Sequence, residues 1–251
     1  CETLFFFFLK EAPQLRDKII LQTKGGIVKD LSCHRYDNSA NYLIDCVHKS
    51  LKRLGVEKVD RFLIHRPDSL FNPEETAKAF DKLSQEGAVN EFGVSNFAGG
   101  QIALLQSSSK QKIRYNQVRV SIFHCPMIEY GVNYNRYNDA GVNRDGGTLD
   151  YCRLNEVQIQ CYSPYKGKKK SFIGDIKYPK LNKLLKELAF KYGVTPNAIA
   201  AAWLLKHPAG FAVINGTTQP DRVKQIAKAK DITLTRSEWY ELYLSLGRKL
   251  P

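Results

Sequence analysis

The sequence predicts an α/β protein with a parallel sheet closed as a barrel. Six short apolar runs alternate with stretches of helical spacing, and they cover residues 18–23, 59–64, 89–94, 113–116, 157–161 and 211–216. Strands that alternate with helices form parallel sheets, and a parallel α/β barrel carries its active site at the carboxyl ends of its strands. A polar or aromatic side chain stands at or just after the end of each run: Lys24, His65, Ser95 with Asn96, Gln117, Tyr162 and Thr217. We therefore expect these side chains to surround one pocket.

The helices of the first half follow from spacing and capping residues. Residues 2–15 read as a helix directly before the first strand, and residues 41–54 place apolar side chains every three to four positions. The tetrapeptide Asn72-Pro73-Glu74-Glu75 combines an N-cap residue, a proline and two acids, which is typical of a helix start, and Gly87 marks the end. Another helix is expected near residues 101–106.

The second half begins with a long connection. Residues 123–147 are rich in Tyr and Asn, and loops of this length are usually functional or disordered. A short helix near residues 148–153 precedes the next strand, and residues 181–192 carry an amphipathic stripe. Three more helices are predicted, and their signals are Thr195-Pro196, the stretch 221–229, and a capping box at residues 235–238 closed by Gly247.

Composition indicates one globular domain over residues 1–251. Apolar residues make up 43% and charged residues 25% of the 251 residues, enough for a large core. No run approaches the roughly 20 apolar residues of a membrane span. Barrels of this kind have eight strands and six are found, so we expect two strands upstream of Cys1.

The charge and the cysteines limit the partners. The net charge is +13, which allows nucleic acid, but the basic residues are spread along helices and only residues 166–170 are dense, so a phosphate-bearing ligand is the preferred interpretation. No CxxC pair and no cluster with metal-ligand spacing occurs, so no metal is expected. We interpret the cysteines as reduced thiols of a cytoplasmic protein that is a monomer or a weak homo-oligomer: Cys1, Cys33, Cys46, Cys125, Cys152 and Cys161.

Several short motifs follow the predicted strands in order. They are residues 50–55 (SLKRLG), 65–68 (HRPD), 93–97 (GVSNF), 116–118 (NQV), 149–154 (LDYCRL), 162–164 (YSP), 216–218 (GTT), 220–222 (PDR) and 234–240 (LTRSEWY). In this order the motifs resemble those of the aldo-keto reductases, in particular the bacterial branch related to the oxidoreductase YdhF. The resemblance runs over nearly the whole chain and implies a TIM (β/α)8 barrel that reduces carbonyl compounds with NADPH.

The resemblance also implies a catalytic group of Asp, Tyr, Lys and His. It identifies Lys24 as the Lys and His65 as the His, and it places the Asp and the Tyr upstream of Cys1. The family's Tyr protonates the carbonyl oxygen, and an ammonium beside a phenol lowers the pKa of that phenol. The expected substrate is a small aldehyde or ketone.

The cofactor residues are assigned by the same resemblance. Ser95, Asn96 and Gln117 would hold the nicotinamide carboxamide, whose donor and acceptor match their side chains. Tyr162 would stack on the nicotinamide ring, and Ser163 would meet the pyrophosphate. The adenosine phosphate of NADPH (NADP+) would contact Thr217 and Arg222. Gly216 stands where several branches carry Lys, which weakens the case for NADPH over NADH.

Structural interpretations remain open beside the functional ones. Lys24 and Arg222 could be solvated charges, His65 and Gln117 structural core groups, and Tyr162 a packing aromatic. Ser95 and Asn96 could cap the following helix. At the level of function, an NADP-binding redox-sensing or accessory module of the same fold without significant turnover is the alternative to an enzyme, and a basic nucleic-acid-binding protein is a third.

Overall fold

The computed structural model describes residues 2–30 and 33–251, so the thiol predicted at Cys1 lies outside the described residues. The chain divides into two compact units, Cys1–Asn116 and Gln117–Pro251, which are described separately below. The prediction of a single domain over residues 1–251 stays a prediction.

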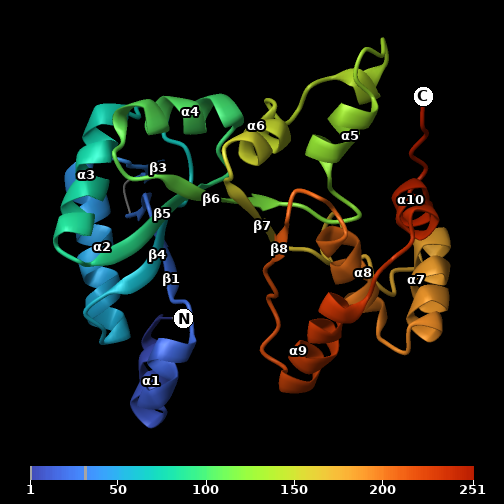
Figure 1. Cartoon of the computed structure of the whole chain (residues 1–251), viewed down its shortest axis with the longest axis horizontal. Coiled ribbons are helices and arrows are strands. Elements are labelled where there is room, and N and C mark those ends of the chain that lie inside the picture. Colours follow the sequence, from blue (N-terminus) through green and yellow to red (C-terminus); the bar gives the residue numbers. More distant parts are fainter. Residues whose placement is uncertain (1, 31–32) are drawn as a thin grey trace. The chain divides into compact units, whose positions relative to one another are not determined.

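The first unit contains four parallel-sheet neighbours in the order β1-β4-β5-β6, of which β6 continues into the second unit (Figure 1). Pairing is parallel between β1 and β4 and between β4 and β5, with Lys24 opposite Leu63 and Phe62 opposite Phe92. The elements are α1 (Glu2–Glu11), η1 (Pro13–Lys18), β1 (Gln22–Gly25), β2 (Ile27–Lys29), β3 (His34–Tyr36), α2 (Ala40–Leu54), β4 (Val59–Ile64), α3 (Pro73–Gln85), β5 (Val89–Ser95), α4 (Gly99–Ser108) and β6 (Ile113–Arg119).

Local signals explain the helices of this unit. The side chain of Asn72 accepts a hydrogen bond from the Glu75 amide at 2.8 Å, which confirms the predicted helix start. Helix α2 ends at Gly55, whose φ of 64° closes the helix in the left-handed conformation. In the core, the rings of Phe80 and Phe92 stack with their centroids 4.4 Å apart and join α3 to β5.

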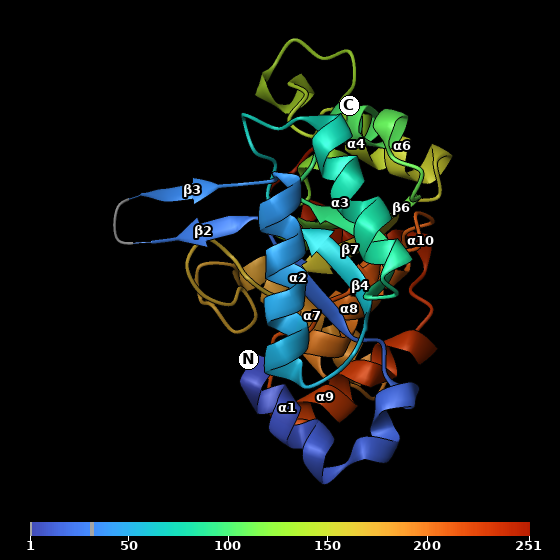
Figure 2. The same cartoon turned by 90° about the vertical axis from the view of Figure 1, so that its left-hand side faces the viewer.

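The start of the first unit differs from its prediction. The helix expected over residues 2–15 stops at Glu11, and a 3-10 helix begins at Pro13, because proline cannot continue the hydrogen bonding of an α-helix. The strand expected over residues 18–23 therefore forms later, as Gln22–Gly25. The antiparallel hairpin of β2 and β3 was not predicted, and Figure 2 shows it extending away from α2.

The second unit holds the end of β6 and the strands β7 and β8, in the order β6-β7-β8. Strands β7 and β8 pair in parallel, but β8 has only two residues, and residues 214–216 of the predicted run 211–216 are exposed. The elements are α5 (Pro126–Val132), η2 (Asp139–Gly141), α6 (Thr148–Leu154), β7 (Gln158–Tyr162), α7 (Pro179–Lys191), α8 (Pro196–Leu205), β8 (Ala212–Val213), α9 (Pro220–Ala227), η3 (Lys228–Asp231) and α10 (Arg236–Leu244).

Helices α8 and α10 are joined by a tryptophan pair. The indoles of Trp203 and Trp239 stack at 4.7 Å, and the Nε1–H of each donates to the backbone carbonyl of the other at 3.0 Å. The predicted capping box is confirmed, since Thr235 and Glu238 exchange side-chain and backbone hydrogen bonds of 3.2 and 2.7 Å. The parallel strands and intervening helices confirm the α/β class. No helix within residues 2–30 and 33–251 is long and apolar enough to cross a membrane.

Candidate functional site

Lys24 and His65 lie side by side in the first unit. Lys24 is on β1 and His65 follows β4 directly, and the parallel pairing sets Gly25 opposite Ile64. The His65 amide donates to the Gly25 carbonyl at 2.8 Å, which extends the pairing by one residue. Both residues line one cavity of about 340 Å³. The structure therefore brings these two predicted catalytic residues together at neighbouring strand ends.

The loop after β4 is fixed by polar contacts. The Asn38 side chain donates to the Arg66 carbonyl at 3.0 Å, and the Asp68 carboxylate accepts from the amides of Asn38 and Leu70 at 3.2 and 2.9 Å. These bonds tie the segment before α2 to the residues that follow His65. The HRPD motif thus fixes the conformation of the loop that begins at His65.

Burial and nearby positive charges lower the pKa of His65 to about 4. Burial is the largest cause, and the positive charges of Lys24, Arg66 and Lys29 add to it. Burial and Arg66 likewise lower the pKa of Lys24. The His65 ring is consequently neutral near pH 7, so one ring nitrogen can donate a hydrogen bond and the other can accept one.

Three further residues on one face of α2 line the same cavity and were missed in the sequence. Tyr42, Cys46 and Ser50 are spaced four residues apart, which places them on a single helix face. The Tyr42 hydroxyl donates to the Ile27 carbonyl at 3.0 Å, and burial raises the pKa of this phenol. The helical spacing of these three residues could be seen in the sequence, but the packing of α2 against β1 could not be predicted from it.

Ser95 and Asn96 close strand β5. Ser95 is buried. Asn96 has a φ of 61°, and its side-chain amide donates a hydrogen bond to the Ser95 hydroxyl at 2.9 Å. The N-cap position of α4 is Ala98, whose backbone amide donates to the Gln101 side chain at 2.9 Å, so the capping role considered for Ser95 and Asn96 stays an interpretation. Asn116 donates to the Phe97 carbonyl at 2.9 Å, which fixes the turn that follows.

In the second unit, Gln117 lies in the core. Its amide donates to Gln160 at 2.9 Å, and both side chains are buried. Gln160 was missed in the sequence because a single Gln within a strand gives no signal of its own. The buried pair agrees with the structural interpretation of Gln117 as a core amide, and it also presents amide groups at neighbouring strands β6 and β7.

The turn after β7 and the segment after β8 lie close together within the second unit. Tyr162 ends β7, and Ser163 has a φ of 53°, which turns the backbone sharply. The Tyr165 hydroxyl donates to the Asn215 side chain at 2.6 Å and so connects the two segments. Thr217 accepts from the Gln219 amide at 3.2 Å, just before α9.

The segment after β8 is open to a ligand. A Cβ atom built on Gly216 would meet no atom within 4 Å, and Arg222 is exposed on the first turn of α9. A hydroxyl and a guanidinium at the start of a helix suit a phosphate group. The residues present therefore fit the phosphate end of a dinucleotide.

Two further features of the described residues concern metal ligands and thiols. Within residues 2–30 and 33–251, no group of three or more His, Cys, Asp and Glu could hold a metal ion. The five described cysteines are free thiols, and burial raises the pKa of Cys125 to about 12 and also raises that of Cys161. Buried thiols with raised pKa values are poor nucleophiles.

Comparison with known proteins agrees with this geometry. The model of the aldo/keto reductase family matches residues 2–243. The chain is 36% identical to a 6-dehydroglucose reductase of Agrobacterium fabrum, over 96% of the chain and 77% of that protein. It is 30% identical to the oxidoreductase YdhF of Escherichia coli, over 100% of the chain and 80% of that protein.

Solved structures show the same fold. A thermostable aldo-keto reductase, Tm1743, superimposes with a TM-score of 0.74 at 25% identity, covering 97% of this chain and 77% of the other. The barrel type expected from the resemblance is thus confirmed, and relatives named as reductases and oxidoreductases support a reductase. The chain belongs to the aldo/keto reductase family.

Proposed function

We propose that the protein transfers a hydride from NADPH to the carbonyl carbon of an aldehyde or ketone. The observation that carries the proposal is the placement of Lys24 and His65 at the ends of two neighbouring parallel strands, where both line one cavity, in a chain of the aldo/keto reductase family. Two relatives, 36% and 32% identical, are named 6-dehydroglucose reductases. We therefore propose an oxidised sugar, or a similar hydroxylated carbonyl compound, as the substrate class.

His65 would orient the carbonyl group. Its neutral imidazole can donate an N–H to the carbonyl oxygen without carrying a charge that the lysine would repel. Lys24 would act on the proton donor: an ammonium close to a phenol stabilises the phenolate and lowers the pKa of the tyrosine that the resemblance implies. The two residues would thus polarise the carbonyl and set the acidity of its proton source.

The dinucleotide supplies the hydride when it is bound. By the resemblance, Ser95, Asn96 and Gln117 would contact the carboxamide, and Tyr162 and Ser163 would contact the ring and the pyrophosphate. Thr217 and Arg222 are proposed for the adenosine phosphate; Arg222 is exposed and Thr217 is half-buried. A single cation there favours NADPH over NADH only modestly.

The test is a comparison of turnover with cofactor binding. We expect NADPH oxidation coupled to reduction of a sugar aldehyde by the wild-type protein, and loss of turnover with retained NADPH binding in Lys24→Met. NADPH binding without turnover on any of a panel of aldehydes and ketones would instead support the redox-sensing module. Absence of NADPH binding by the wild-type protein would overturn both.

A further inference from the structure

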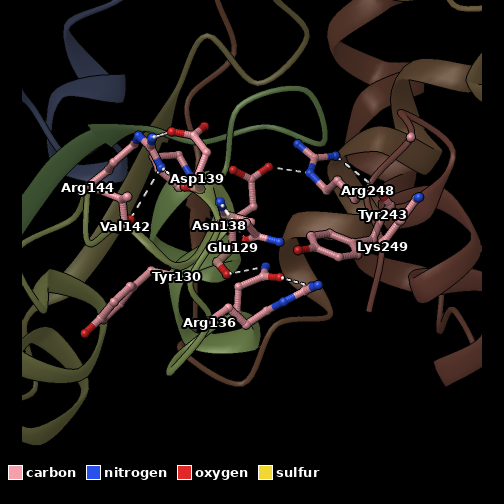
Figure 3. Close-up of a pocket in the computed structure, with 14 residues that line it drawn as sticks. Glu129, Tyr130, Arg136, Asn138, Asp139, Val142, Arg144, Tyr243, Arg248 and Lys249 are labelled. Carbon is pink, nitrogen blue, oxygen red and sulfur yellow. Dashed lines mark hydrogen bonds and ion pairs between the residues drawn. The ribbon is translucent and has the colours of Figure 1, made fainter. Parts of the chain in front are cut away.

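The second unit contains another cavity, of about 490 Å³, which none of the predicted site residues lines. Its walls come from the connection after β6, over residues 126–144, and from residues 243–249 near the C-terminus (Figure 3). Pockets that hold small molecules have volumes of this order. The cavity is therefore large enough for a ligand the size of a monosaccharide derivative.

The lining carries a surplus of positive charge. Two of its four cations are paired with its two carboxylates: Arg144 meets Asp139 at 2.6 Å, and Arg248 forms an ion pair with Glu129. The remaining two are Arg136 and Lys249.

Neither of these two cations is neutralised by the lining carboxylates. Arg136 donates to the neutral side-chain oxygen of Asn133 at 3.2 Å. Arg136 is half-buried and Lys249 is exposed, and two positive charges beside one cavity attract an anion.

A buried hydroxyl adds a directed hydrogen-bond donor. Tyr243 is fully buried, and its hydroxyl forms no hydrogen bond of normal geometry with the described residues, the Asn133 side chain being its polar neighbour. Its ring is held by the Arg248 guanidinium at 5.0 Å and by Trp239 at 5.7 Å, and Figure 3 shows the hydroxyl directed toward the other labelled side chains. An unpaired buried hydroxyl is unfavourable, so a ligand oxygen that accepts from it is stabilised.

We propose that this cavity binds a small hydroxylated organic anion, a carboxylate or a phosphate monoester. Arg136 and Lys249 hold the anionic group, and Tyr243 donates to one of its oxygens. The ion pair of Arg248 with Glu129 joins the two walls, that of Arg144 with Asp139 lies within one of them, and the other two cations are left to the ligand. This cavity contains none of the residues assigned to carbonyl reduction, and the proposal does not depend on that activity.

The first experiment is calorimetric titration of the whole protein with gluconate, with glucose 6-phosphate, and with neutral glucose. At least one of the two anions is expected to bind saturably at one site, and glucose is not; the tighter anion identifies the preferred group. The double variant Arg136→Gln with Lys249→Gln should weaken binding about tenfold or more, since each lost contact is charge-assisted.

The control removes the same charge elsewhere. Lys180→Gln with Lys186→Gln changes two exposed lysines of α7 in the same unit and should leave the affinity unchanged. Equal weakening by both double variants would show general attraction to a chain of net charge +13 and would overturn the proposal. The proposal is also wrong if neither anion binds at millimolar concentration.

A second variant separates binding from folding. Tyr243→Phe keeps the ring and removes the hydroxyl, so the affinity for the anion should fall several-fold while the melting temperature of the free protein stays the same or rises. Melting at a lower temperature with unchanged anion affinity would show that the hydroxyl serves the fold alone.

Discussion

The pair Lys24–His65 and the segment from Gly216 to Arg222 both carry positive charge, but their surroundings differ. The pair is partly buried on two strands, and the neighbouring charges lower the pKa values of both groups before any ligand arrives. The segment is mainly exposed, and Arg222 stands on the surface of α9. In the first region the fold already shifts the pKa values of the free protein, whereas the exposed side chains of the second region would form their main contacts only when a ligand binds. Catalytic effects should follow changes in the first region and cofactor selectivity changes in the second.

The largest effect is expected from Lys24→Met. Removing the ammonium should lower the turnover number by about 10²–10⁴-fold, the usual contribution of a positioned acid–base group, with the NADPH dissociation constant changed little. Steady-state kinetics and cofactor fluorescence measure the two quantities. Lys58→Met, at an exposed lysine of the same unit, is the matched control. A parallel loss of NADPH affinity in Lys24→Met would contradict the division between the two regions.

Arg222→Ala should act on the cofactor alone. Loss of one charge-assisted contact should raise the dissociation constant of NADPH about ten- to a hundredfold and leave that of NADH nearly unchanged. Titration of both dinucleotides against wild type and variant decides this. Lys224→Ala, two residues along the same exposed helix, serves as the control. Equal weakening of both dinucleotides would mean that Arg222 is not the phosphate contact.

His65 gives a prediction about pH. Its folded-state pKa of about 4 lies below the usual 6.5, so the unfolded chain takes up this proton first. The contribution of His65 to stability should therefore fall as the pH drops from about 6.5 to about 4, and should be constant above that window. NMR titration, with the His65 resonance assigned through His65→Gln, checks it. An imidazole that titrates near its usual pKa would show that Lys24 and burial do not act on it.

The smallest effect concerns the link between the two segments of the second unit. Tyr165→Phe removes the 2.6 Å bond to Asn215, and a neutral hydrogen bond contributes about 0.5–1.5 kcal/mol. NADPH affinity should fall by a corresponding few-fold, with the Lys24-dependent turnover number unchanged at saturating cofactor. Tyr178→Phe offers a control at another tyrosine of this unit. A large drop in the turnover number would contradict this prediction and would show that the Tyr165–Asn215 bond contributes to the catalytic step.

The sequence predicted those parts of the fold in which local signals and packing agree. Strands β4 and β5 follow apolar runs, and α3 and α10 begin at the caps expected of them. The hairpin of β2 and β3 was missed because each strand has only three residues: the apolar pair Ile27-Val28 is too short to show a periodicity, and β3 is polar and exposed.

The candidate sites show the same limit. Lys24 and His65 could be placed because each follows an apolar run directly and matches a residue that the family resemblance assigns, although β1 itself forms later than predicted. Gln160 and Tyr42 could not, since their relevance depends on which elements pack together. In the cavity lined by residues 126–144 and 243–249, Glu129 forms an ion pair with Arg248. These two residues are far apart in the sequence, so no local sequence pattern could predict their contact.

The stacked indoles of Trp203 and Trp239 have a practical consequence for spectroscopy. They are the only two tryptophans in the sequence, and both lie beyond Gln117, so tryptophan fluorescence reports on the second unit alone. Two nearly parallel chromophores at 4.7 Å couple their electronic transitions, which should give a paired-sign band in near-ultraviolet circular dichroism. This signal would not report the unfolding of the first unit, which contains Lys24 and His65, so the first unit requires a separate spectroscopic probe.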